Sequence, residues 1–190
     1  MTKTRIAIFA SGTGSNAVNL IHFFKDHSSI EVAFVLSNKS DAKVLSSAKE
    51  LGVKTMYYSN AQVADGAFLT QVCADENVDW VILAGYLRLI PSELIQAFEN
   101  KMINLHPSLL PNYGGKGMHG RKVHEAVLAN REKESGITVH FVNEDFDKGR
   151  IIAQFHCKLE SEDTVENLEG KIRYLEQRYF PTVVQNTINQ

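Results

Sequence analysis

The chain has 190 residues, 44% of them hydrophobic and 22% charged, which is ordinary for one globular domain. Its 20 basic and 22 acidic residues give a net charge of −2, which argues against nucleic acid as a partner. The longest apolar runs, such as Trp80–Leu87, are far shorter than the roughly 20 residues of a membrane helix, and the start does not resemble a signal peptide. The two cysteines, Cys73 and Cys157, are expected to be reduced, as in a cytoplasmic protein.

Strand and helix patterns alternate through the first half of the chain. Short apolar runs predict strands, and the amphipathic segments between them predict helices. Ser15 or Asn16 is expected to cap the first helix and Asp41 the second, because short polar side chains accept hydrogen bonds from helix N–H groups. The strands are expected over 5–10, 31–36, 54–58, 79–84 and 101–105, and the helices over 16–25, 41–51, 67–75 and 91–98.

The second half of the chain follows a different pattern. A helix is expected over 122–130, then two strands over 137–142 and 151–159 that the loop NEDFDKGR joins as a hairpin. A last helix is expected over 164–179, with a new start after Pro181 left open. The alternation followed by a hairpin predicts an α/β fold, with a mostly parallel twisted sheet flanked by helices and a late antiparallel hairpin.

A glycine-rich turn, FASGTGSNA (9–17), connects the first expected strand to the first expected helix. Its glycines let backbone N–H groups approach an anion at the helix N-terminus, although a tight turn without a ligand would look the same. The spacing of Gly12, Gly14 and Ala17 also fits the loose dinucleotide fingerprint. A dinucleotide enzyme usually carries Asp or Glu after its second strand, where this chain has SNK (37–39). We therefore expect a single phosphate at Gly14, Ser15 and Asn16.

The segment INLHPSLLP (103–111) places an amide and an imidazole two residues apart at the end of the fifth expected strand. Alternate strand residues point to the same side, so Asn104 and His106 are expected to face one crevice at the carboxyl edge of the sheet. The amide donates without titrating, and the imidazole donates or transfers protons near neutral pH. Together they suit a carbonyl that becomes a tetrahedral oxyanion, and Pro107 and Pro111 restrict the chain that follows.

An acid catalyst of this kind benefits from a carboxylate, which favours imidazolium and raises the pKa of the histidine. Three carboxylates, Glu144, Asp145 and Asp147, lie in the loop NEDFDKGR beside the fifth strand. Spacing alone does not choose among them, and Asp is also common in turns, but Asp147 is the leading candidate. Three further histidines are interpreted as structural: His22, His27 and His156.

Six segments in one order span nearly the whole chain: AIFASGTGSNA, FVLSNK, VILAGYLRLIP, INLHPSLLP, GITVHFVNEDFDKGRII and LEQRYFP. Together they resemble the glycinamide ribonucleotide (GAR) formyltransferase family of folate-dependent purine synthesis, which has a Rossmann-like fold. HPSLLP alone is shared with methionyl-tRNA formyltransferases and formyltetrahydrofolate deformylases, but SGTGSN is most similar to the GAR enzymes. The resemblance implies a single formyltransferase domain over 1–190, with a phosphate and ribonucleotide side in about 1–100 and a catalytic and folate side in about 101–190.

The resemblance also implies a reaction and a set of site residues. The amine of GAR would attack the formyl carbon of the co-substrate 10-formyltetrahydrofolate, giving formyl-GAR and tetrahydrofolate in de novo purine (IMP) synthesis, without a metal. Asn104 and His106 would stabilise the oxyanion, and Asp147 would pair with His106 and raise its pKa. The residues implied to bind GAR are Gly14, Ser15, Asn16, Arg173, Tyr174, Leu175 and Glu176. Those implied to line the folate pocket are Leu87, Arg88, Leu89, Ile90, Asn104, Asn143, Glu144, Asp145, Phe146 and Asp147.

Two features depart from the family pattern. Family members commonly read Tyr-Pro-Gly and then His-x-His, whereas this chain has a longer, glycine-rich segment over 113–121. His124 fits the second family histidine better than His119 does, which leaves His119 without an assigned role. Many members also carry an arginine before the third helix. This chain has none between Arg5 and Arg88, so Arg88 or a lysine is expected to meet the glutamate tail of the folate.

Four other functions fit parts of the sequence. A methionyl-tRNA formyltransferase would be expected to have a further C-terminal domain and a basic surface for tRNA. A deformylase would be expected to have an N-terminal regulatory domain. We expect none of these features in this protein. A metal hydrolase could use His106, His119, His124 and Asp147, but their spacing matches no ligand motif. A non-catalytic sensor of GAR-like phosphates would keep its output without His106. The expected partners are therefore small molecules, with neither nucleic acid nor membrane, for a cytoplasmic monomer or homodimer.

Overall fold

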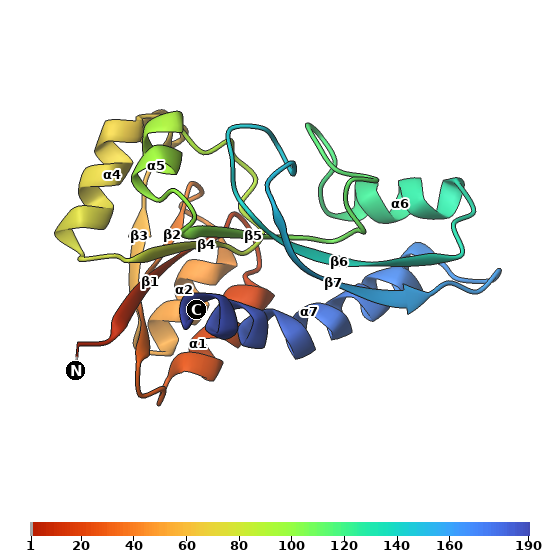
Figure 1. The fold of residues 1–190 in the computed structure, drawn as a ribbon, viewed down its shortest axis with the longest axis horizontal. Coiled ribbons are helices and arrows are strands. Elements are labelled where there is room, and N and C mark those ends of the chain that lie inside the picture. The colour runs from red at the N-terminus through yellow and green to blue at the C-terminus, as the bar shows by residue number, and fades with distance from the viewer. Residues whose placement is uncertain (1) are drawn as a thin grey trace. The chain divides into compact units, whose positions relative to one another are not determined.

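The computed structural model describes residues 2–190 and divides the chain into two compact units. The first unit ends at Asn104, and the second runs Leu105–Gln190. Figure 1 labels the strands of both units and most of their helices. No helix within the described range is long and apolar enough to cross a membrane.

The first unit is built on five parallel strands: β1 (Thr4–Phe9), β2 (Ile30–Ser37), β3 (Lys54–Tyr57), β4 (Trp80–Leu83) and β5 (Met102–His106). They lie in the order β3-β2-β1-β4-β5, so β1 is central. The chain adds β2 and β3 on one side of β1 and then β4 and β5 on the other side. Ile6, Ile8 and Phe9 are fully buried, which is what a parallel strand covered on both faces requires. The division between the units falls within β5, after Asn104.

Helices cover the two faces of this sheet. The helices are α1 (Ser15–Phe24), α2 (Lys43–Glu50), α3 (Asn60–Val63), α4 (Gly66–Asp75) and α5 (Ser92–Ala97). α1 packs with α2 and α4 with α5, and the two pairs lie on opposite sides of the strands (Figure 1). The strands and helices expected in this half are confirmed, with ends shifted by a few residues. The short α3 was not expected, although Ser59 and Gln62 form a capping box at its start.

The expected helix caps are wrong. The N-cap of α1 is Gly14 at φ 75°, so Ser15 and Asn16 lie inside the helix. The N-cap of α2 is Ala42, one residue beyond Asp41. The Val44 N–H in the first turn of α2 instead donates to the Gly12 carbonyl over 3.2 Å. The glycine-rich turn therefore takes over part of the role of a side-chain cap.

The second unit consists of α6 (Arg121–Ala129), β6 (Glu134–Phe141), β7 (Ile151–Lys158) and α7 (Val165–Ile188), together with the end of β5. β6 and β7 pair antiparallel, which confirms the expected hairpin. α7 packs along both strands and contacts α6 (Figure 1). The complete strand order is β3-β2-β1-β4-β5-β6-β7, a mostly parallel sheet that includes the antiparallel pair of β6 and β7.

α7 continues through Pro181 instead of ending before it. Proline removes one helix hydrogen bond and costs about 3 kcal/mol in a helix interior. Phe180, Pro181 and Val184 are all buried, so the packing of this helical face offsets that cost. Two residues before Pro181, Tyr179 stacks on Phe155 of β7 with ring centroids 4.0 Å apart. Tertiary contacts therefore decide where this helix ends.

Candidate active site

The end of β5 carries the amide and the imidazole that the sequence pattern paired. Asn104 and His106 lie two residues apart on this strand, so their side chains leave it on the same side. Asn104 is half-buried and is paired with Leu83 of β4, whereas His106 is only 4% exposed. Asn104 closes the first unit, and His106 makes its contacts with Tyr113 and Asp147 within the second.

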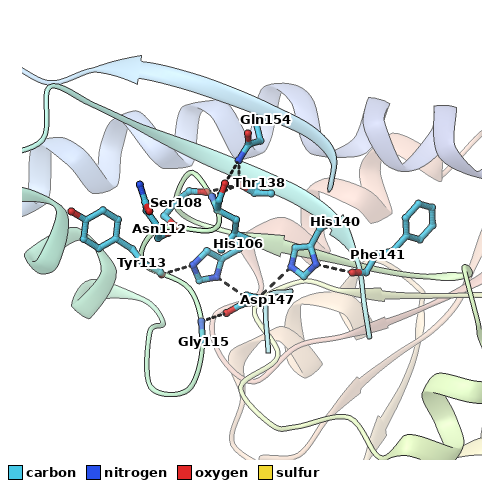
Figure 2. Close-up of polar contacts among 11 residues, drawn as sticks. His106, Ser108, Asn112, Tyr113, Gly115, Thr138, His140, Phe141, Asp147 and Gln154 are labelled. Atoms are coloured by element: carbon cyan, nitrogen blue, oxygen red, sulfur yellow. Dashed lines mark hydrogen bonds and ion pairs between the residues drawn. The ribbon is translucent and has the colours of Figure 1, made fainter. Parts of the chain in front are cut away.

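The loop that follows His106 is held to β6 by the hydroxyl of Thr138 (Figure 2). This hydroxyl donates to the Ser108 carbonyl over 2.7 Å and accepts the backbone N–H of Leu110 over 3.0 Å. Gln154 of β7 donates to the same hydroxyl oxygen and to the Leu110 carbonyl, both over 2.9 Å. Because these groups are largely shielded from water, the network fixes the loop firmly.

Each ring nitrogen of His106 faces an oxygen atom (Figure 2). Nε2 lies 2.8 Å from the carbonyl oxygen of Tyr113, and Nδ1 lies 3.5 Å from Oδ1 of Asp147. Carbonyl and carboxylate oxygens only accept hydrogen bonds, so the surroundings suit a ring with a proton on both nitrogens. Gly115 donates its backbone N–H to Oδ2 of Asp147 over 2.9 Å. The carboxylate is thus oriented through both of its oxygens.

Both residues that contact His106 have a left-handed backbone. Tyr113 has φ 58° and Asp147 has φ 55°, a region that costs on the order of 1–3 kcal/mol for most side chains. The Tyr113 hydroxyl donates to Oε1 of Glu132 over 2.6 Å, which helps to hold this conformation. Strained backbone of this kind collects at functional sites.

The structure distinguishes Asp147 from the two other candidate carboxylates. The Asp147 side chain is 12% exposed and faces His106. Glu144 and Asp145 are exposed, and Asp145 faces Lys148 at 3.4 Å. Of the three carboxylates that spacing left open, only Asp147 is brought to the imidazole by this loop.

The electrostatic balance at His106 differs from the one expected. Burial lowers the pKa of His106 below its ordinary value of 6.5, although the Asp147 charge and the Tyr113 carbonyl act to raise it. The expectation of a raised pKa is wrong, because removing the ring from water outweighs what one carboxylate returns. Burial also acts to raise the pKa of Asp147. However, contacts with His140, His106 and the Gly115 N–H together hold it below 3.8, which keeps the carboxylate ionised near neutral pH.

A second buried histidine on β6 was missed by the sequence reasoning. The side chain of His140 is 2% exposed, and its Nε2 lies 3.7 Å from the same Oδ1 of Asp147 (Figure 2). Its Nδ1 lies 2.8 Å from the carbonyl oxygen of Phe141. The feature of the sequence that could have identified His140 is the two-residue period of the strand, which places it on the same face as Thr138.

Two candidate histidines remain, His119 and His124. His119 is exposed. His124 on α6 is 5% exposed, and burial lowers its pKa. Across residues 2–190, no three His, Cys, Asp or Glu side chains come together as a set of metal ligands.

The glycine-rich turn of the first unit is tied to its neighbours by the Ser11 hydroxyl. This hydroxyl donates to Oδ1 of Asn38 over 2.7 Å and accepts the backbone N–H of Leu87 over 2.9 Å. The amide of Asn38 in turn donates to Asn60 over 2.9 Å. At Gly14, a Cβ would overlap the side chain of Val44, so the turn packs tightly on α2. The N–H groups of the first turn of α1 are therefore held at a fixed place.

The chain matches the formyl transferase family over residues 4–184. It belongs to this family. It is 39% identical over 188 residues to the chloroplastic phosphoribosylglycinamide formyltransferase of Arabidopsis thaliana, covering 96% of this chain and 64% of that protein. It is 35% identical over 190 residues to the phosphoribosylglycinamide formyltransferase of Bacillus subtilis (strain 168), covering 97% of this chain and 94% of that one. The crystal structure of phosphoribosylglycinamide formyltransferase from Streptococcus pneumoniae TIGR4 matches with a TM-score of 0.86 and 31% identity, covering 99% of both chains. The chain thus spans somewhat less than two thirds of the plant relative's length.

The residues implied to bind folate fall into two segments. In the first unit, Leu87 and Leu89 are 48% and 54% exposed, Arg88 is exposed, and Ile90 is 5% exposed. Exposed leucines of this kind are available to an apolar ligand surface, whereas Ile90 serves the core. In the second unit, the loop before Asp147 is exposed at Asn143, Glu144, Asp145 and Phe146.

The residues on α7 implied to hold GAR do not share one face. Arg173 and Glu176 are three residues apart and therefore neighbours on the helix surface. Tyr174 is 58% exposed, and its hydroxyl accepts a hydrogen bond from Arg178 over 3.0 Å. Leu175 is only 7% exposed and belongs to the buried stripe of the helix.

Proposed function

We propose that the chain is a phosphoribosylglycinamide formyltransferase, which transfers the formyl group of 10-formyltetrahydrofolate to the amine of GAR in de novo purine synthesis. The observation that carries this proposal is the His106–Asp147 contact at the end of β5. It occurs in a chain whose relatives carry that enzyme's name over nearly its whole length. The products are formyl-GAR and tetrahydrofolate.

The chemistry requires donors for an oxygen that becomes negative. When the GAR amine adds to the formyl carbon, a C–N bond forms and the carbonyl electron pair moves onto oxygen. The Asn104 amide and the His106 Nε2–H donate to that oxygen and lower the barrier. Collapse restores the carbonyl and breaks the bond to N10, which takes up the proton that the amine loses, with His106 as the relay. The lowered pKa of His106 supports this role, because a weaker base releases the proton more readily.

The Tyr113 carbonyl holds the same Nε2–H that the oxyanion needs. We therefore expect the oxyanion to replace this carbonyl and the segment 113–121 to shift when substrates bind. Gly115, Gly117 and Gly120 in this segment all have positive φ, so their backbone conformations are ones that glycine adopts without strain.

The residues proposed to bind GAR come from two segments of the chain. The phosphate is proposed at Gly14, Ser15 and Asn16, since the first N–H groups of α1 favour an anion and Gly14 holds the turn in place. Arg173 and Glu176 of α7 are proposed to contact the ribose of GAR. Tyr174 and Leu175 are proposed to support these two side chains by packing. The folate is proposed to use the residues described above in the segments 87–90 and 143–147.

The wider assignments remain part of the proposal. 10-Formyltetrahydrofolate is the proposed co-substrate, and the proposed reaction uses no metal ion. Monomer or homodimer stays a prediction. A cytoplasmic location also stays a prediction, because the Arabidopsis relative is named as chloroplastic and location therefore differs among relatives.

A formyl-transfer assay tests the proposal. The purified chain is incubated with GAR and 10-formyltetrahydrofolate, and formyl-GAR and tetrahydrofolate are measured together. Equal amounts of the two products are expected, with none when formate replaces the folate donor. Asn104→Ala and His106→Ala are each expected to lower kcat on the order of 100- to 1000-fold, and His156→Ala, on the exposed part of β7, is the control. Absence of product with the wild type would reject the enzyme and leave a GAR-binding sensor.

A further inference from the structure

His140 is a buried histidine that the proposed reaction does not use. It lies where the pairing of β6 and β7 shifts register, between Val139 and His140. Val139 is opposite Ala153 and His140 opposite Ile151, so the extra residue is on β7 and the two-residue alternation along β6 continues. Gly149 lies beside the ring, since a Cβ there would lie 3.4 Å from Nδ1 and would overlap the Phe141 carbonyl. The local backbone is therefore shaped to hold this imidazole in one place.

Both ring nitrogens of His140 face oxygen atoms that only accept. Nδ1 lies 2.8 Å from the Phe141 carbonyl oxygen, so the neutral ring carries its proton there. Nε2, 3.7 Å from Oδ1 of Asp147, then presents a lone pair to a negative charge. Only a second proton on Nε2 makes this contact favourable. The surroundings of His140 thus suit a ring with a proton on both nitrogens.

The ring of His106 has the same kind of surroundings as the ring of His140. Its Nε2 faces the Tyr113 carbonyl, and its Nδ1 is 3.5 Å from Oδ1 of Asp147. The neutral ring therefore also presents a lone pair to the carboxylate, and it too needs a second proton to pair. Two imidazoles meet one oxygen, whose single charge compensates only one of them.

We propose that His140 is a positioning residue that shares Oδ1 of Asp147 with His106 and competes with it for a single second proton. When His140 carries this proton, it fixes the carboxylate and reduces the attraction that Asp147 exerts on a proton at His106. The lowering influence of His140 on the pKa of His106 agrees with this competition. The effect on turnover rests on the proposed function, but the protonation of the two rings does not.

Other charged groups near the pair lie further out. Arg150 stacks over the Phe141 ring, with its guanidinium carbon 4.4 Å from the ring centroid, on the His140 side. On the His106 side, α6 brings His124, whose pKa is influenced by Glu169, by Arg121 and by His106 itself. None of these groups is substituted in the test, so their contributions stay constant.

Nitrogen NMR of the imidazoles tests the proposal directly. His140→Gln keeps a donor for Asp147 but cannot carry a charge. The pKa of His106 is therefore expected to rise by roughly one unit in this variant. His156→Gln is the matched control, since His156 is an exposed histidine 3.3 Å from Oε2 of Glu134, and it should leave the pKa of His106 unchanged. An unchanged or lower pKa of His106 in His140→Gln would overturn the competition.

A measurement on the wild type decides the question if His140→Gln does not fold. The proposal expects a proton on Nδ1 of His140 at every pH and a titration of His106 in two steps, one for each ring. The proposal would be overturned if the neutral ring of His140 carried no proton on Nδ1. It would also be overturned if His106 titrated in a single step, independent of His140. In turnover, the decline of kcat on the alkaline side should move to higher pH in His140→Gln with the KM for GAR unchanged. Failure of formyl transfer itself would leave the NMR result standing.

Discussion

Oδ1 of Asp147 lies 3.5 Å from Nδ1 of His106, and this carboxylate opposes the effect of burial on the ring. Burial lowers the pKa of His106, and the Asp147 charge acts in the opposite direction. An Asp147→Asn variant keeps the ring buried but removes the charge. The pKa of His106 should therefore fall still further below its ordinary value.

The first prediction is the pH profile of Asp147→Asn. Only the form of His106 with a proton on both nitrogens benefits from Asp147, and it is present only below the pKa. If formyl transfer depends on this form, kcat should fall as the pH rises through the pKa of His106. In the variant this fall should begin at a lower pH than in the wild type, so that kcat is lower on the order of 100-fold near neutral pH. Measuring kcat from about pH 5 to about pH 9 checks this. Coincident profiles would show that the carboxylate does not act on the ring.

The second prediction separates backbone strain from the contact with Asp147. Gly115 and Gly117 have φ of 95° and 88°, and an added Cβ meets open space at both. Alanine at either position should therefore cost a similar stability, about 1 kcal/mol. Only Gly115 donates to Asp147, so only Gly115→Ala should also lower kcat by shifting that N–H. Urea unfolding and kinetics of both variants test this, and equal kcat values would mean that the Gly115 bond has no catalytic role.

Much of the fold could be predicted because periodicity and burial agree in it. β1 and β2 are short apolar runs, and the glycines after β1 end that strand where the sequence pattern placed its end. The exceptions arise from contacts distant in sequence. Pro181 continues a helix because Phe180 and Val184 beside it are buried, which no local preference for ending at proline reveals.

The candidate site could be predicted in its residue types but not in its energetics. The spacing of Asn104 and His106 follows from the strand period, and family resemblance selected Asp147 from three carboxylates. The direction of the pKa shift at His106 depended on how deeply the ring is buried, which sequence does not give. His140 was missed because a histidine inside a strand pattern looks like any other buried residue until its partner is known.

The third prediction concerns the turn before α1. Gly14 has φ 75°, and a Cβ there would overlap the Val44 side chain, whereas a Cβ at Gly12 meets open space. Gly14→Ala should therefore lose on the order of 2–4 kcal/mol of unfolding free energy, and Gly12→Ala less than about 0.5 kcal/mol. Adding Val44→Ala to Gly14→Ala should recover little of the loss, because the Cβ of residue 44, 2.4 Å from the added Cβ, remains. Denaturant unfolding of the four proteins checks this, and equal stability of the two single variants would contradict the close packing.

The fourth prediction is a loss of stability in mild acid through His124. Its side chain is 5% exposed, and its Nδ1 has no hydrogen-bond partner within residues 2–190. Burial lowers the pKa of His124 below 6.5, despite the raising effect of Glu169.

The sign of this effect follows from proton binding in the two states. The folded pKa of His124 lies below the unfolded one, so the unfolded chain takes up the proton first as pH falls. Stability should therefore decline below about pH 6.5 and level off below the folded pKa, by at most about 1.4 kcal/mol per pH unit from this group. His106 adds a decline of the same sign. His124→Gln should reduce the slope of unfolding free energy between about pH 6.5 and about pH 5, whereas His119→Gln, at an exposed position, should leave it unchanged. If both variants keep the wild-type slope, His124 is not the group whose burial opposes its protonation.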